Sequence, residues 1–136
     1  MDVGAGSAAA DVAPVLPTIP NATVRREALL ERLRALDGER LVLVSAAAGS
    51  GKSALLASWA AELDVPVAWH GCQEREVDHD LFWHRLERSV VTAFAPHGMV
   101  GSEVVEDAAG SSPAERLTAQ LGSVAGPAVI VIDDLH

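Results

Sequence analysis

The sequence predicts an α/β fold in which a parallel sheet is flanked by helices. Short runs rich in valine, isoleucine and leucine alternate along the chain with segments whose apolar residues recur at helical spacing. Strands that alternate with helices in this way pair in parallel, because each helix returns the chain to the same edge of the sheet. The alternation therefore indicates βαβ units.

Three segments are expected to form strands. ERLVLVSA at 39–46 is a short β-branched run, which is typical of a strand buried on both faces. VPVAWHGC at 65–72 has Pro66 near its start, where a missing backbone N–H costs least. PAVIVIDDLH at 127–136 is an apolar run that ends in two carboxylates. Each of these runs has a helical segment before it in the chain.

Four segments have helical patterns, at 24–38, 52–63, 78–94 and 112–122. The first has an apolar stripe and closes on Asp37-Gly38; its leucines are Leu29, Leu30, Leu33 and Leu36. In the third, Asp78 or Asp80 is placed to cap the start. The residues expected on its packed face are Leu81, Phe82, Leu86, Val90 and Phe94. Ser112 as N-cap and Pro113 in the first turn begin the fourth.

Composition limits the classes of function. The chain has 136 residues, of which 49% are hydrophobic, and a formal net charge of −9. This acidity argues against a segment that grips a nucleic-acid backbone, which requires clustered Lys and Arg. No apolar run reaches the ~18 residues that a membrane span needs. The single cysteine, Cys72, excludes an internal disulfide and favours a reducing, cytoplasmic location.

Two regions lack a pattern of regular structure. Residues 1–20 are mostly Ala, Gly and Pro, which cannot bury enough apolar area to offset the entropy of ordering, and are expected to form a flexible tail. Residues 95–112 are rich in Gly, Ser and acidic residues and are expected to form a loop. The folded domain is accordingly expected at 21–136.

The stretch AAAGSGKS at 46–53 predicts a phosphate-binding loop. It lies between an expected strand and an expected helix, where the backbone wraps so closely that successive N–H groups point at phosphate oxygens. An inward Cβ would block that approach, which accounts for the small residues. The expected nucleotide contacts are Ala46, Ala47, Ala48, Gly49, Ser50, Gly51, Lys52, Ser53 and Ala54.

Two side chains of this loop have specific expected roles. Lys52 would place its ammonium near the β and γ phosphates as a catalytic group, and Ser53 would offer its hydroxyl to Mg²⁺. The general pattern G-x-x-x-x-G-K-[ST] has glycine where this chain has Ala46, which is small enough to be tolerated at negative φ. An Ala/Gly-rich loop with a stray lysine is the alternative interpretation.

The third expected strand supplies the other half of the site. A buried strand that delivers a carboxylate at its carboxyl end suits a Mg²⁺–nucleotide site opposite the phosphate loop. Asp133 is therefore the expected metal ligand, and Asp134 a candidate base or water-orienting catalytic group. Without the phosphate loop upstream, this pair would read as ordinary solvated carboxylates.

Together these segments resemble the N-terminal ATPase core of the large ATP-binding LuxR-type (maltose-activator-like) regulators, which belong to the STAND class of P-loop NTPases. The resemblance covers about residues 15–136, and its more specific signals are the Arg/Leu helix before the first strand and the Asp78-His79-Asp80 segment. Alanine at 46 fits this family well. The chain departs from it at Ala47, where proline is common, and at Gly71-Cys72-Gln73, where a Ser-Leu-Asp type sequence often occurs.

The resemblance implies an ATP-dependent switch. ATP and Mg²⁺ would be the cofactors, with Val24 and Arg25 as the adenine contacts, and ATP binding would favour an assembled, homo-oligomeric form. DNA would be bound only by a helix-turn-helix domain downstream. In such proteins the strand after the double-aspartate strand inserts beside the phosphate-loop strand, so we expect an incomplete sheet and a fragment that is marginally stable and a poor ATPase.

Other functions were weighed against the switch. An AAA+-type ATPase or a small-molecule kinase would share both motifs, but a kinase needs an arginine-rich lid, and residues 95–112 contain no Arg or Lys. An inert remnant that binds ATP as a structural ligand is a third possibility. A zinc site is disfavoured, because His79 and His84 lie five residues apart and on different faces of the expected helix.

Overall fold

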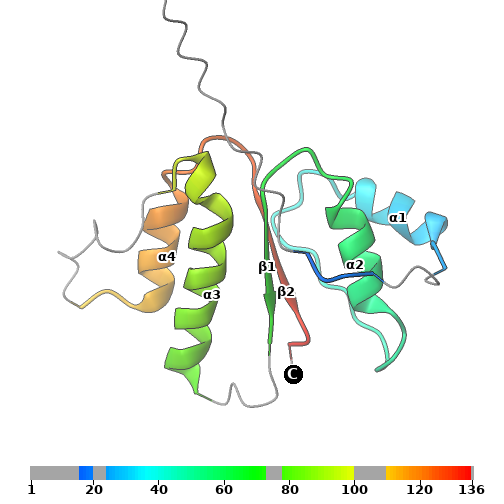
Figure 1. Cartoon of the computed structure of the whole chain (residues 1–136), viewed down its shortest axis with the longest axis horizontal. Coiled ribbons are helices and arrows are strands. Elements are labelled where there is room, and N and C mark those ends of the chain that lie inside the picture. Colours follow the sequence, from blue (N-terminus) through cyan, green and yellow to red (C-terminus); the bar gives the residue numbers. More distant parts are fainter. Residues whose placement is uncertain (1–15, 20–23, 73–77, 100–109, 136) are drawn as a thin grey trace, which may run out of the picture.

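The protein has three layers, with a small parallel sheet between two pairs of helices (Figure 1). The computed structural model describes residues 16–19, 24–72, 78–99 and 110–135. The sheet consists of β1 (Val67–Gly71) and β2 (Val129–Asp133). The helices α1 (Glu27–Arg34) and α2 (Lys52–Ala60) lie on one side, and α3 (His79–Phe94) and α4 (Pro113–Leu121) on the other. The α/β class predicted from the sequence is confirmed.

The sheet is held by one in-register parallel ladder. Val67 lies opposite Val129, and Gly71 opposite Asp133. Hydrogen bonds extend the pairing beyond both ends: Val129 N donates to Pro66 O at 2.9 Å, and Cys72 N donates to Asp133 O at 2.9 Å. The register brings the carboxyl ends of both strands to the same edge, and two of the three predicted strands are confirmed.

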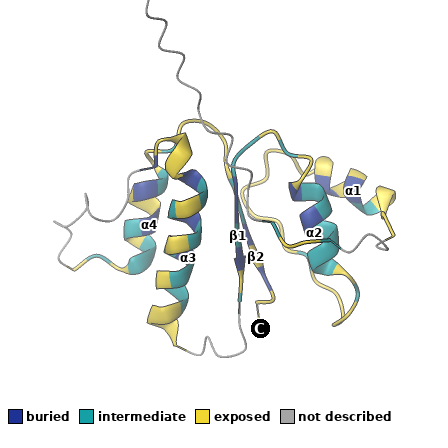
Figure 2. Ribbon diagram, in the orientation of Figure 1, coloured by how far each residue is buried: buried dark blue, intermediate teal, exposed yellow. Residues whose placement is uncertain are grey.

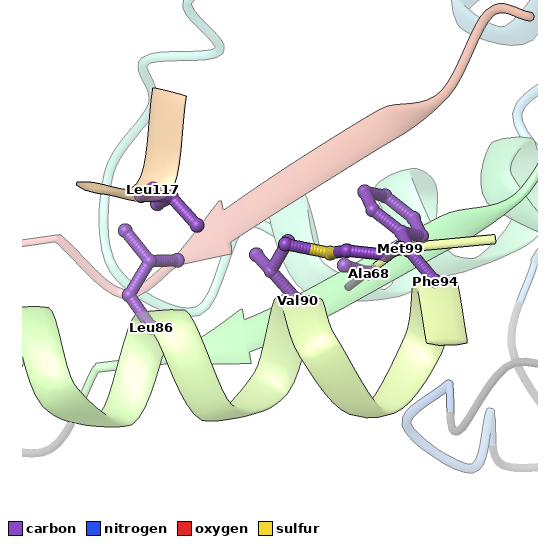
Figure 3. Packing of buried hydrophobic residues seen from close by; sticks show 6 residues of the cluster. All are labelled: Ala68, Leu86, Val90, Phe94, Met99 and Leu117. Atoms are coloured by element: carbon purple, nitrogen blue, oxygen red, sulfur yellow. The ribbon is translucent and has the colours of Figure 1, made fainter. Parts of the chain in front are cut away.

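Side chains alternate between the two faces of the sheet and form a hydrophobic cluster on each. On the α3 side, Ala68 packs against helix residues in a cluster drawn in Figure 3, whose buried members are Ala68, Leu86, Val90, Phe94, Met99 and Leu117. On the α2 side, Val67 and Val131 pack with Ala60, beside the half-buried Leu56 and Trp59. Because both faces are covered, β1 is mostly buried, as Figure 2 shows.

The predicted strand at 39–46 is wrong for the described structure. Residues 41–47 have no regular secondary structure, and the side chains of Leu41 and Leu43 are 85% and 84% exposed. The physical reason is that a strand is stabilised by a ladder with a neighbour, and the ladder of β2 in the described residues is made with β1 alone. The apolar side chains of this segment are therefore not covered by a neighbouring strand or helix in the described structure.

Helix boundaries follow the expected start signals. Asp78 caps α3, accepting a hydrogen bond from Asp80 N at 2.9 Å. Ser112 caps α4 in a reciprocal capping box, because its hydroxyl accepts from Glu115 N and the Glu115 carboxylate accepts from Ser112 N at 2.7 Å. These bonds satisfy donors that would otherwise be unpaired in the first turn.

Several finer expectations differ from the structure. The first helix ends at Arg34, and a turn leads to Gly38, whose φ of 92° suits glycine. Leu36 and Leu81, expected on packed faces, are 40% and 37% exposed, since Leu36 lies in the turn after α1 and Leu81 in the first turn of α3. Of the predicted loop, Ala95–His97 form a 3-10 helix, and residues 100–109 lie outside the described residues.

Most of the predicted tail also lies outside the described residues. Residues 16–19 are described, and Leu16 is half-buried against the cluster on the α2 side of the sheet. The apolar side chain of Leu16 thus has a packing partner.

The α3 cluster provides a direct test of what holds the fold. Phe94 is fully buried, so Phe94→Ala should lower the free energy of unfolding by about 3–5 kcal/mol through lost burial and the cavity left behind. Leu81→Ala, on the same helix at a partly exposed position, is the control and should cost much less. Urea denaturation measures both. Equal losses would contradict the packing.

The capping box predicts a dependence of stability on acid. Hydrogen bonds from the backbone N–H and the side chain of Ser112 lower the pKa of Glu115 below its ordinary 4.5. A lowered folded-state pKa means that the stabilisation is present at neutral pH and is lost as the pH falls through the folded-state value. Glu115→Gln should therefore lower stability at pH 7 and flatten the acid-dependent part of the unfolding profile. Glu31→Gln, at an exposed position of α1, should keep the wild-type profile.

Candidate phosphate-binding site

The predicted phosphate loop forms a tight turn at the start of α2. Ser50 N donates to Ala47 O at 3.2 Å, and Gly49 and Gly51 have φ values of 74° and 83°. These left-handed conformations strain residues with a Cβ, so glycine at both positions follows from the path of the chain. Gly51 is the N-cap residue of α2, and the loop therefore leads directly into the positive end of that helix.

Lys52 lies folded over the first residues of its own loop. Its ammonium donates hydrogen bonds to Ala46 O at 2.9 Å and to Ala47 O at 3.1 Å. Within the described part of the chain these carbonyls are its only polar partners, and no carboxylate pairs with it. An ammonium that is held by neutral carbonyls keeps its full positive charge, so it remains able to bind an anion at the loop.

Further polar groups lie beside Lys52. The Ser50 hydroxyl oxygen is buried, and among the described residues it has no hydrogen-bond partner. An unpartnered buried hydroxyl is unfavourable unless a bound group or water satisfies it. Ser53, in the first turn of α2, is half-buried. The loop thus combines one cation, one unsatisfied hydroxyl and a helix start.

The two aspartates of β2 differ in exposure. Asp133 is 8% exposed, and its Oδ1 accepts a hydrogen bond from Asp134 N at 3.0 Å. Asp134 is exposed and has a φ of 55°, the only positive φ of a non-glycine residue in the described ranges. The turn at Asp134 ends the strand and directs the chain away from the sheet.

The phosphate loop and the tips of both strands lie toward the same end of the molecule, at the bottom of Figure 1. No hydrogen bond or ion pair joins Lys52 to Asp133 in the described structure. The fold therefore brings the two predicted halves of the site to one end, and leaves the space between their side chains without a direct contact. A bridging ligand would have to connect them.

A small pocket adjoins the loop on its α1 side. It has a volume of about 190 Å³, and the residues that line it are Val24, Arg26, Leu30, Gly51, Ala54, Leu55 and Ser58. Val24 and Ala54, both predicted as nucleotide contacts, are among them. A Cβ on Gly51 would lie 3.7 Å from Arg26 Nη2, so this guanidinium reaches the loop itself.

Arg26 was missed in the sequence analysis, where Arg25 was expected beside the nucleotide. Arg25 instead pairs with Glu27, from Nε at 2.8 Å, and with Glu62 through Nη2, and it does not line the pocket. Arg26 is the N-cap residue of α1 and has non-helical backbone angles, so the helical period of the sequence does not mark it.

A wider groove of about 610 Å³ lies at the starts of α3 and α4, on the opposite side of the sheet from the phosphate loop. It is lined by residues of mixed charge: Asp78, Asp80, Leu81, His84, Pro113 and Arg116. It is larger and more open than the first pocket, and none of its lining residues belongs to the phosphate loop. The smaller pocket is the better candidate site because it adjoins the loop.

Two histidines make ring contacts or hydrogen bonds with neighbouring side chains. His70 is buried on β1, with its Nδ1 3.4 Å from Ser89 Oγ and its ring edge-on to Phe82. His79 Nε2 accepts a hydrogen bond from Trp83 Nε1 at 2.9 Å. A search of the described ranges found no group of three His, Cys, Asp or Glu side chains placed to hold a metal ion. The same residues contain no helix that meets the length and apolarity needed to traverse a bilayer.

Comparisons with known proteins identify the family that the sequence matches. The AAA ATPase domain family matches residues 23–136. The chain is 32% identical over 117 residues to the HTH-type transcriptional regulator MalT of Klebsiella pneumoniae subsp. pneumoniae, a match that covers 84% of this chain and 13% of that protein. MalT of Yersinia enterocolitica is 30% identical with the same coverage. No solved structure matches the chain.

The loop conformation predicts which glycine matters. Gly51→Ala should destabilise the chain by about 1–2 kcal/mol, because a side chain at φ 83° is strained even though its Cβ would meet the Arg26 guanidinium only at an ordinary contact distance of 3.7 Å. Gly71→Ala is the matched control: its backbone is outside the left-handed region and its Cβ would meet no atom within 4 Å. Thermal or urea denaturation compares the two variants. A Gly51→Ala protein as stable as wild type would contradict the described turn.

Proposed function

The chain belongs to the AAA ATPase domain family, and from this premise we propose that it binds Mg-ATP as the switch module of a LuxR-type transcriptional regulator. The observation that supports this most is the loop at 46–53, with its paired left-handed glycines and a lysine that has no carboxylate partner in the described residues. The resemblance to the N-terminal ATPase core of MalT-like regulators accounts for the rest of the chain.

The phosphates would be bound by the loop. Lys52 would exchange the carbonyls of Ala46 and Ala47 for the β and γ phosphates, which offer a charged partner in place of two neutral ones. The backbone N–H groups of the loop and the helix start add further attraction for the negative charge. The unsatisfied hydroxyl of Ser50 fits a site that a polar ligand completes.

The residues present fit a magnesium ion. The Ser53 hydroxyl and the Asp133 carboxylate are the hard oxygen donors that Mg²⁺ prefers. Asp133 uses Oδ1 to accept from Asp134 N, which leaves Oδ2 for the metal or one of its waters. When bound, the ion would neutralise charge on the phosphates. Asp134, exposed at the turn after β2, would orient the attacking water.

The base would lie in the pocket beside the loop. Val24 and Leu30 provide apolar surface, and the planar guanidinium of Arg26 can stack on or donate to a flat heterocycle. Arg26 thus replaces Arg25 as the expected base contact. In this proposal the pocket selects the base, and the loop holds the triphosphate.

The wider role follows the family. ATP binding would favour an assembled homo-oligomer in the cytoplasm, and slow hydrolysis would reset it. A further C-terminal domain would bind DNA, since the net charge of −9 in this chain opposes contact with a nucleic-acid backbone. The chain spans 13% of the length of its curated relatives, which leaves room for such domains.

Substitutions at the two halves of the site test the proposal. Lys52→Ala and Asp133→Asn should each weaken Mg-ATP binding at least about tenfold, because a charge-assisted contact contributes roughly 1.5–3 kcal/mol. Arg32→Ala removes an exposed cation of α1 that lines neither the loop nor the pocket and should bind as wild type does. Isothermal titration measures all three. Wild-type affinity in both site variants would overturn the assignment.

Lys52 also permits a labelling test, because it is the only lysine of the chain. Mg-ATP should protect its ε-amine from an acylating reagent, while the N-terminal amine reacts at an unchanged rate. Mass spectrometry of the labelled peptides reports both amines. Equal labelling of Lys52 with and without Mg-ATP would contradict phosphate binding at this loop.

A further inference from the structure

Four charged side chains of alternating sign form a closed ring beside the base pocket. Arg25 pairs with Glu27 through Nε at 2.8 Å and with Glu62 through Nη2. Arg34 completes the ring, since its Nη1 contacts Glu27 at 2.8 Å and its Nη2 contacts Glu62 at 2.7 Å. A second hydrogen bond runs from Arg34 Nε to the same oxygen, Glu62 Oε2, at 3.0 Å. Each carboxylate therefore accepts from both arginines.

Three members of the ring come from the region of α1, and the fourth comes from the end of α2. Arg25, Glu27 and Arg34 lie in or beside α1, whereas Glu62 follows the last turn of α2. Glu62 is therefore the ionic connection between α1 and α2 in this ring. The opposite end of α2 begins at Lys52, directly after the phosphate loop.

The residues of the ring lie next to residues that line the base pocket. Arg25 lies between Val24 and Arg26, which both line the pocket, while Leu55 and Ser58 of α2 line its other side. The contact of Arg25 with Glu62 therefore joins the segment on one side of the pocket to the end of the helix on its other side. The buried Leu30 of α1 lines the same pocket as Leu55 and Ser58 of α2.

Each ion pair of the ring stabilises the contact between α1 and α2 only weakly. The Glu62 side chain is 27% exposed and the Arg34 side chain 40%, so water screens each pair and a single one contributes little. The hydrogen bond from Arg34 is the largest effect on the pKa of Glu62 and lowers it, so Glu62 is ionised at neutral pH. Because each of the four groups contacts two groups of opposite charge, the ring orders the side chains more than isolated pairs do.

We propose that Glu62 is a positioning residue for the nucleotide base: through Arg25 and Arg34 it holds the segment of Val24 and Arg26 against α2 and so keeps the base pocket formed. The proposal rests on the proposed function of the site. Glu62 touches neither the pocket nor the phosphate loop. Its effect should therefore appear only for ligands that have a base.

The test compares two ligands on the same protein. Glu62→Gln keeps the size of the side chain and removes its charge; it should weaken Mg-ATP binding about threefold at low ionic strength. Glu62→Arg, which faces Arg25 and Arg34 with a like charge, should weaken it about tenfold. Both variants should bind Mg-tripolyphosphate, which has no base, within about twofold of wild type. Since exposed pairs are screened by salt, the difference between Glu62→Gln and wild type should shrink in about 0.5 M NaCl.

Controls separate the possible outcomes. Glu31→Gln, an equivalent change on an exposed site of α1, should bind both ligands as wild type does. Tripolyphosphate binding by the Glu62 variants shows that their phosphate loop is folded. Unchanged Mg-ATP affinity, or an equal loss for both ligands, would overturn the positioning role. A wild-type chain that binds neither ligand would overturn the proposed function itself.

Discussion

The parallel ladder between β1 and β2 is the interaction on which the rest of the structure depends. Its register sets Gly71 opposite Asp133, so the acidic end of β2 lies at the edge where β1 also ends. Its two faces divide the helices into an α3 layer and an α2 layer, each with a separate hydrophobic cluster. The position of the phosphate loop follows, because α2 packs on one face with its first residue toward the strand tips.

Much of this arrangement could be predicted from the sequence, where local signals agree with tertiary packing. Local sequence signals account for three features of the structure: the apolar runs of β1 and β2, the helix caps at Asp78 and Ser112, and the glycines of the loop. The irregular structure at 41–47 could not be predicted in the same way. The apolar pattern of 39–46 is correct for a buried strand, and whether a strand forms there depends on the presence of a neighbouring strand.

In the candidate site, too, some features follow from local sequence and others depend on distant residues. The conformation of the phosphate loop follows from small residues and a lysine, which single-sequence reasoning can read. In our proposal, the choice between Arg25 and Arg26 as the base contact depends on a distant partner, Glu62, which pairs with Arg25, and on the path of the backbone before α1. Charge pairs that join remote parts of a chain leave no periodic trace in the sequence. The match to the AAA ATPase domain family supports the chemistry of the loop and does not determine these side-chain contacts.

The bare leucines at 41 and 43 have a consequence for the chain in solution. Exposed apolar side chains on a segment that has no ladder partner among the described residues favour association between identical molecules. Electrostatic repulsion between molecules that each have a formal net charge of −9 opposes this association at neutral pH. That protection fades toward the isoelectric point near 4.8, so colloidal behaviour, in addition to folding, becomes sensitive to acidity.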